Sequence, residues 1–153
     1  MTRKNFIVLA PLLFLCISQV TVAQGRLEGK LEHLKTWAGK YPTQRKGRVT
    51  TSFFALPEIR APLLQLLKRP DFNLLTREYG VESLIKQIGD YLVVQVCRAH
   101  NCGDEHGALV INLRSGDMYV RMKDEEKVRW FASKGNAKDL PQAVQDDLND
   151  GSS

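Results

Sequence analysis

Residues 91–113 read YLVVQVCRAHNCGDEHGALVINL, two apolar runs joined by a short polar segment. Tyr91–Cys97 and Gly107–Leu113 are rich in Val, Leu and Ile, which is typical of buried strands. The segment between them is too short for the crossover connection that parallel strands need. The stretch therefore predicts two antiparallel strands, with Tyr91–Cys97 as a central strand of a sheet.

Further strands are expected on both sides of this pair. Ser83–Ile88 precedes Gly89-Asp90, a two-residue turn of the kind that closes hairpins. Downstream, Met118–Met122 and Lys127–Phe131 are separated by a short acidic turn. Because all these connections are short, neighbouring strands should be antiparallel. The pattern predicts a five-stranded antiparallel meander.

Helices are expected before and after these strands in the sequence. Apolar residues recur at helical spacing ahead of Gly39, at Leu27, Leu31, Leu34, Trp37 and Ala38. A second, short helix is expected between Pro62 and Pro70, and a third after Asp139 and Pro141. Together the elements predict an α+β domain, a five-stranded antiparallel sheet with helices packed on one face. Segment 43–59 stays ambiguous at this level.

The first 23 residues predict a secretory signal. A basic start precedes an apolar run from Phe6 to Leu15, and small residues up to Ala23 suit a signal peptidase. The run is too short for a comfortable membrane span. We therefore expect residues 1–23 to be removed, with no membrane attachment afterwards, and residues 24–153 to form a single domain.

Two cysteines remain after such cleavage, Cys97 and Cys102. In an exported protein they most simply pair with each other. The bridge would close a very short loop and contribute only about 2 kcal/mol to stability. Its more useful effect is local, because it fixes both ends of the loop and leaves His100 near the apex. A loop held in one shape loses less entropy when it binds a partner.

Charge is divided along the chain. Residues 24–80 carry 11 Lys/Arg and 5 Asp/Glu, a net charge of +6, whereas residues 81–153 carry 9 and 12, a net charge of −3. A basic half raises the question of nucleic-acid binding. Export and the scattered positions of the basic residues argue against it, so no nucleic-acid partner is expected.

The loop resembles the hallmark of a known family. Cys97-Arg98-Ala99-His100-Asn101-Cys102 is similar to the Cys-Lys-Pro-His-Asp-Cys loop of the inhibitors of vertebrate lysozyme, the Ivy family. Lys127–Phe131 is similar to that family's Lys-x-x-Trp strand, and the resemblance covers roughly residues 81–150. It implies an antiparallel sheet with helices. It also implies a periplasmic, often homodimeric protein of Gram-negative bacteria that is an inhibitor rather than an enzyme and needs no cofactor.

In that family the loop enters the lysozyme cleft and its histidine reaches the catalytic carboxylates. The resemblance therefore implies that His100 is the key contact and that a lysozyme, first of all a c-type lysozyme, is the partner. A neutral imidazole can accept a hydrogen bond from the protonated acid and donate one to the ionised carboxylate of such a site. Asp104 and Glu105 beside the loop, with the net acidity of residues 81–153, are expected to favour encounter with a basic lysozyme.

Ala99 and Asn101 depart from the family's proline and aspartate. Ala99 makes the loop less rigid, and Asn101 removes one charged contact while keeping a hydrogen-bond acceptor. These changes leave open a weaker inhibitor, or one directed at another muramidase such as the cell's own lytic transglycosylases. A different class of function, an exported cell-envelope interaction module, is the alternative.

Other chemistries at the loop are disfavoured. A metal site built from Cys97, Cys102, His100 and His106 has no standard zinc spacing, and a disulfide would consume both thiols. A cysteine nucleophile with His100 as its base fails for the same reason. The acidic runs are typical of solvated turns, so a small hydrolase ranks last. We assign no catalytic residue and no metal ligand.

Overall fold

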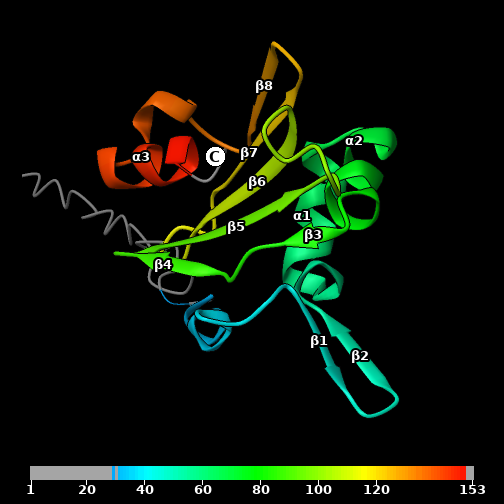
Figure 1. Cartoon of the computed structure of the whole chain (residues 1–153). Helices are drawn as coiled ribbons and strands as arrows, with labels where there is room; N and C mark the ends of the chain where they lie inside the picture. The colour runs from blue at the N-terminus through cyan, green and yellow to red at the C-terminus, as the bar shows by residue number, and fades with distance from the viewer. Residues whose placement is uncertain (1–28, 30, 151–153) are drawn as a thin grey trace, which may run out of the picture.

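The computed structural model describes Gly29 and residues 31–150 of the 153-residue chain (Figure 1). The expected signal, residues 1–23, lies outside the described residues. Within the described part, no helix is both long and apolar enough to cross a membrane.

An antiparallel sheet of six strands forms the centre of the protein. Its strands are β3 (Val81–Glu82), β4 (Lys86–Ile88), β5 (Tyr91–Cys97), β6 (Glu105–Asn112), β7 (Met118–Asp124) and β8 (Lys127–Ala132). Strands β5 to β8 pair in sequence order, and β3 and β4 share the outer edge of β5. The predicted α+β class and antiparallel sheet are confirmed, as are the bounds of the strand Tyr91–Cys97.

The edge strand predicted as Ser83–Ile88 is divided into β3 and β4. Both pair with β5, but their registers differ by one residue, as at a β-bulge. Ile85 lies at the break, where its N–H donates to the carbonyl of Lys40 (2.8 Å) and its carbonyl accepts from the N–H of Gly39 (2.8 Å). The edge is broken because the earlier segment takes over these backbone bonds.

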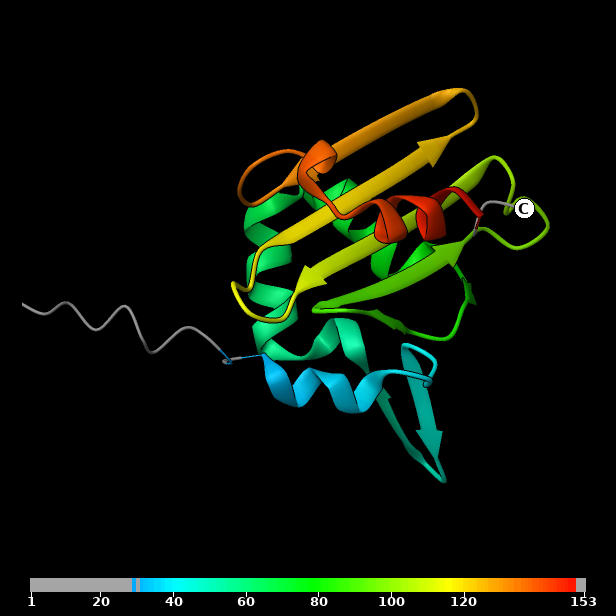
Figure 2. The same ribbon diagram turned by 90° about the vertical axis from the view of Figure 1, so that its left-hand side faces the viewer.

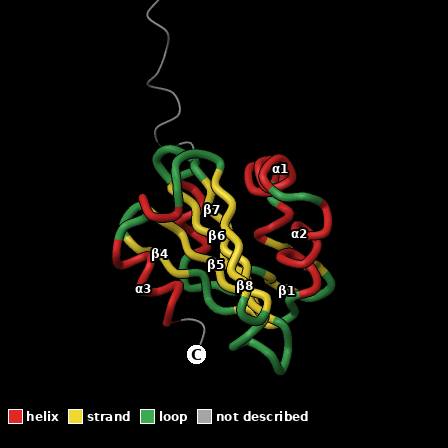
Figure 3. Tube along the Cα trace, turned by 90° about the horizontal axis from the view of Figure 1, so that it is seen from above, coloured by secondary structure: helices red, strands yellow, loops and turns green. Residues whose placement is uncertain are grey.

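Helices cover both faces of the sheet, which corrects the expectation that they pack on one face (Figure 3). Leu92 and Val94 point into a larger core with α1 (Pro57–Leu66) and α2 (Arg69–Asn73). Val93 points the other way, into a smaller core with α3 (Gln142–Asp150). The reason is that β5 and β6 are apolar along almost their whole length, so neither face can be left to water.

The last helix behaves as its sequence pattern predicts. Leu140, Val144 and Leu148 are all buried on the smaller core. A short 3₁₀ turn, Ala137–Asp139, leads into α3, and Asn136 begins it with a capping box in which Asp139 takes part.

The N-terminal helices differ from the prediction. The first is a 3₁₀ helix, Glu32–Trp37, which buries Leu34; Leu27 lies outside the described residues. Helix α1 begins at Pro57 and contains Pro62, rather than beginning there. Either proline suits a first helical turn, and the helix begins at the earlier one, directly after the 3₁₀ turn that buries Phe53 and Phe54. After α2, a π-helical turn at Leu74–Glu78 leads into β3.

The segment that the sequence left ambiguous forms a hairpin. Strands β1 (Thr43–Lys46) and β2 (Val49–Ser52) pair only with each other, and a 3₁₀ turn at Phe53–Ala55 follows them. The hairpin extends away from the main sheet in two perpendicular views (Figures 1 and 2).

Gly107 allows the larger core to pack closely against β6. A Cβ atom at this position would lie 2.7 Å from Leu75 Cδ1 and 3.3 Å from Tyr79 Cε2, both of which are buried. We expect Gly107→Ala to lower the free energy of unfolding by about 1–3 kcal/mol, as overpacking does. Urea denaturation would measure it. Gly80→Ala is the control, because a Cβ there meets no atom within 4 Å, and an equal loss in both variants would show that close packing is not the cause.

Candidate functional site

The loop between β5 and β6 is closed by a disulfide. Cys97 ends β5, and its sulfur is bonded to that of Cys102, with the two Cα atoms 4.9 Å apart. The predicted pairing of these cysteines is confirmed. Because Cys97 also lies opposite His106 in the β5–β6 ladder, the bridge and the ladder fix the base of the loop on the end of the sheet.

His100 lies in this loop with its side chain exposed. Within the described part of the chain, its imidazole forms no hydrogen bond or ion pair. Its backbone has a φ of 66°, in the left-handed region. A residue other than glycine pays about 1–2 kcal/mol to adopt this conformation. The loop therefore holds a histidine, at a cost, where glycine would be favoured.

Glu105 ties the two sides of the loop together. Its carboxylate accepts from Arg98 Nε (2.6 Å) and from Asn101 Nδ2 (2.9 Å), one oxygen for each. The backbone repeats the connection, since Arg98 N–H donates to the Glu105 carbonyl (3.0 Å) and Glu105 N–H donates to the Asn101 carbonyl (2.8 Å). Hydrogen bonds to a carboxylate are stronger than neutral ones. The shape of the loop thus rests on a covalent bridge and on this carboxylate.

The charge of Glu105 is therefore paired inside the loop. The expectation that it adds to an acidic surface beside the loop is corrected, because the Arg98 guanidinium lies against it. Asp104 is the exposed carboxylate of the pair, 3.8 Å from Lys123 Nζ. Exposed carboxylates beside the loop are those of Asp104 and of Glu125, whose N–H donates to the Asp104 carbonyl (2.9 Å).

His106 supports the loop from beneath. Its Nδ1 lies 3.2 Å from the carbonyl oxygen of Cys102, and its Nε2 lies 2.6 Å from Arg121 Nη1. A guanidinium only donates, so Nε2 accepts and the proton on Nδ1 is donated to Cys102. Arg121 also donates to the carbonyl of Leu148 in α3 (3.3 Å). His106 and Arg121 together therefore link the loop, the sheet and the last helix.

Burial, and then the charge of Arg121, lower the pKa of His106, while its bond to Cys102 acts in the opposite direction. In the unfolded chain the histidine pKa is about 6.5. Below that pH the unfolded state binds the proton first, so this contribution to stability is present above pH ~6.5 and is lost as the pH falls toward the folded pKa. We expect the Tm of the wild type to fall more between pH 7 and pH 5 than that of His106→Gln. Parallel Tm curves would contradict this.

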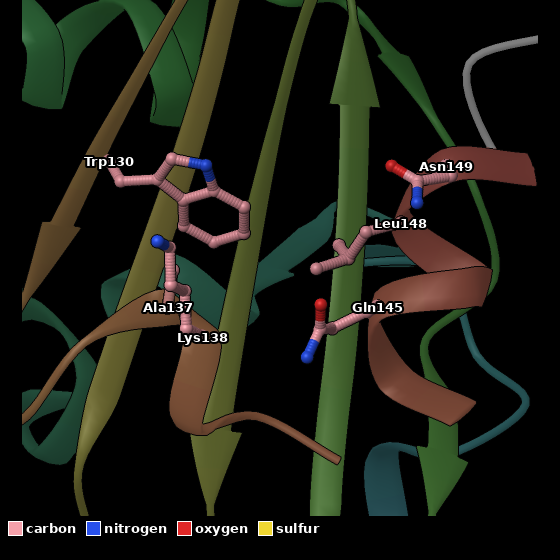
Figure 4. Close-up of a pocket in the computed structure, with 6 residues that line it drawn as sticks. All are labelled: Trp130, Ala137, Lys138, Gln145, Leu148 and Asn149. Carbon is pink, nitrogen blue, oxygen red and sulfur yellow. The ribbon is translucent and has the colours of Figure 1, made fainter. Parts of the chain in front are cut away.

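A separate hollow lies between β8 and α3 (Figure 4). It encloses about 140 Å³ and is lined by Trp130, Ala137, Lys138, Gln145, Leu148 and Asn149. Trp130, the tryptophan of the Lys-x-x-Trp strand, therefore faces α3 rather than the disulfide loop. It pairs across the ladder with Arg121, the residue that bonds His106.

The family model for inhibitors of vertebrate lysozyme (Ivy) matches residues 58–153. The chain belongs to the Ivy family. The matched region of this Ivy-family protein runs from α1 to the end of the chain and includes the disulfide loop and the main sheet. The β1–β2 hairpin lies outside it. No match is found among curated proteins or among solved structures.

In this Ivy-family chain the six predicted loop residues lie together in one closed turn, but they do not share one direction. Arg98 and Asn101 bond to Glu105, whereas His100 projects to solvent. In the described residues, no group of three or more His, Cys, Asp or Glu is placed to hold a metal ion. The sequence reasoning missed the supporting roles of Glu105, His106 and Arg121. For His106, the sequence signal of a buried polar contact is its position at the start of the apolar strand β6.

Proposed function

We propose that this protein inhibits lysozyme by inserting the Cys97–Cys102 loop into the active-site cleft, with His100 as the main contact. The observation that carries the proposal is the state of His100, an exposed imidazole held in a left-handed backbone conformation on a doubly fixed loop. Backbone strain of this kind persists where the surrounding structure enforces it, and it gathers at functional positions. The Ivy family match supplies the class of partner.

The charge of the loop suits this partner. A lysozyme cleft presents one protonated acid and one carboxylate, which a neutral imidazole satisfies with one acceptor and one donor nitrogen. Residues 97–102 contain no acidic side chain, and the nearby Glu105 is neutralised by Arg98. The loop therefore approaches the two catalytic carboxyl groups without an unpaired negative charge at its tip. The protein acts by occlusion and performs no chemistry itself.

The proposal extends to the location and the partner class. Removal of residues 1–23 would deliver the protein to the periplasm of a Gram-negative bacterium, where disulfides form. There it would meet c-type lysozymes that cross the outer envelope. The cell's own lytic transglycosylases are the second class of target, since they act on the same glycan.

A cell-lysis turbidity assay tests the function directly. Purified protein in excess over hen-type lysozyme is expected to slow the clearing of a bacterial suspension, because the occupied cleft no longer admits glycan. A lytic transglycosylase assayed in parallel separates the two targets. Full lysozyme activity at a large excess of protein would contradict the proposal.

Asn101 offers a test of how the loop is held. In Asn101→Asp a second carboxylate would face Glu105 Oε1, which now accepts from the asparagine at 2.9 Å. We expect this variant to lose about 1–2 kcal/mol of unfolding free energy, because a hydrogen bond becomes a like-charge contact. Thermal melts at pH 7 measure the loss. Asp104→Asn is the control beside it, and stability of Asn101→Asp equal to the parent would show that Glu105 does not tie the loop.

A further inference from the structure

The β1–β2 hairpin lies within an unusually basic stretch. Between Glu32 and Glu58 the sequence has five Lys/Arg and no Asp/Glu. Arg45, Lys46 and Arg48 surround the hairpin turn, and all three side chains are exposed. Within the residues that the structure describes, none of these three forms an ion pair. Their positive charge is therefore not neutralised by the protein.

The root of the hairpin is fixed to the protein, while its tip extends into solvent. Thr43 donates from its N–H (2.9 Å) and from Oγ1 (2.6 Å) to the two carboxylate oxygens of Glu82. At the other end, Phe53 and Phe54 are buried in the larger core. Gly47 begins the two-residue turn with a φ of 61°, as a type II′ hairpin turn requires. The turn of the hairpin lies away from the main sheet (Figure 2).

Apolar groups accompany the charge. Val49 is 66% exposed beside the turn, and Tyr41 is 51% exposed at the root. Val49 lies directly opposite Lys46 in the ladder, so the two side chains share one face of the hairpin. At the root, a hollow of about 310 Å³ is lined by Trp37, Lys40, Gln44, Arg45, Lys46 and Thr51. Cations with exposed aliphatic and aromatic groups are the composition of segments that lie on anionic membranes.

We propose that the β1–β2 hairpin is a docking arm for anionic phospholipid surfaces, which departs from the expectation of no membrane attachment once the signal is removed. Phosphate headgroups complement Arg45, Lys46 and Arg48, and the side chain of Val49 leaves water at the acyl boundary. A nucleic acid would satisfy the cations but would give Val49 no apolar environment. A basic lysozyme would be repelled by the hairpin, so this surface serves a partner other than the one proposed for the loop. It also lies outside the Ivy match, residues 58–153.

Vesicle co-sedimentation tests the proposal on the full protein purified after export from an expression host. The protein is expected to sediment with vesicles of phosphatidylcholine that contain about 30 mol% phosphatidylglycerol, because the attraction is to surface charge. With vesicles of pure phosphatidylcholine it should stay in the supernatant. Binding should be lost in about 0.5 M salt. A triple variant should bind the anionic vesicles more weakly than the parent, by a factor of about thirty or more. Its substitutions are Arg45→Gln, Lys46→Gln and Arg48→Gln.

The control removes the same charge elsewhere. Lys127→Gln, Lys134→Gln, Lys138→Gln changes the net charge equally, and binding should fall by less than about threefold, because long-range charge is screened. Val49→Ser should bind several-fold more weakly at unchanged charge, and unchanged binding would contradict insertion of the tip. All variants alter exposed side chains, so equal thermal midpoints will show that they fold. Equal losses in the two triple variants, or binding to a DNA duplex in place of vesicles, would overturn the proposal.

Discussion

Replacing His100 with alanine is expected to raise the inhibition constant against hen-type lysozyme about a thousandfold and to leave the fold intact. The imidazole is exposed and contacts no partner in the described part of the protein, so its removal creates no cavity. In the cleft it would lose two hydrogen bonds to carboxyl groups. Bonds to charged groups contribute about 1.5–3 kcal/mol each, and a total of about 4 kcal/mol corresponds to that change in affinity. Titration of lysozyme activity against inhibitor concentration measures it.

Two further variants separate the side chain from the backbone. His100→Gly removes the imidazole and also relieves the left-handed strain, since φ is 66° there. It should inhibit as poorly as the alanine variant while being about 1 kcal/mol more stable than it. His33→Ala removes a histidine far from the loop, one that bonds Glu58 at 2.7 Å, and should inhibit like the parent. Strong inhibition by either His100 variant would mean that the loop backbone, and not the imidazole, blocks the enzyme.

The parts of the fold that sequence reasoning predicted well are those that local patterns determine. The bounds of β5, Tyr91–Cys97, follow from a stretch rich in Val and Leu that only Gln95 interrupts. The preceding Gly89-Asp90 turn sets the start of that run, and Ile88 pairs with Tyr91 as a two-residue hairpin requires. Neither inference needs information from distant parts of the chain.

The errors arise where two distant segments compete or cooperate. The strand Ser83–Ile88 is interrupted because Ile85 bonds the backbone at 39–40, which no local pattern reveals. The placement of helices on both faces of the sheet, by contrast, has a local signature in the sequence. Consecutive buried residues at Leu92, Val93 and Val94 require a cover on both faces of the sheet.

In the candidate site, too, some residues can be identified from the sequence, and others only from contacts between distant segments. The two cysteines and His100 could be identified from the sequence, because two cysteines so close together in an exported chain most simply pair and enclose the histidine. The supporting pair His106 and Arg121 could not, since their contact depends on the register of β6 with β7. The direction of Glu105, inward rather than toward solvent, depends on the turn that the disulfide imposes.

Removing the bridge, by replacing Cys97 and Cys102 with serine, is expected to weaken inhibition about a hundredfold. Without the disulfide, residues 98–101 regain freedom that binding must remove again, at about 1 kcal/mol for each residue ordered. The Glu105 contacts to Arg98 and Asn101 offset part of this cost, so we expect a net loss of about 3 kcal/mol in binding. Reduction of the parent protein should reproduce the loss, and the same reductant should not affect the double variant.

The unfolding free energy separates this effect from a general loss of structure. A bridge across so short a loop contributes about 2 kcal/mol by chain entropy, and a domain with ordinary stability stays folded after that loss. Glu105→Gln in the parent should weaken inhibition about tenfold by itself, since the neutral amide offers one acceptor oxygen to Arg98 and Asn101 where the carboxylate offers two. In the double serine variant, Glu105→Gln should weaken inhibition by a larger factor, because the disulfide and the Glu105 carboxylate each hold the loop when the other is removed. If the two losses are simply additive, the bridge and the carboxylate do not stabilise the same loop conformation, and His100 is not presented by their joint action.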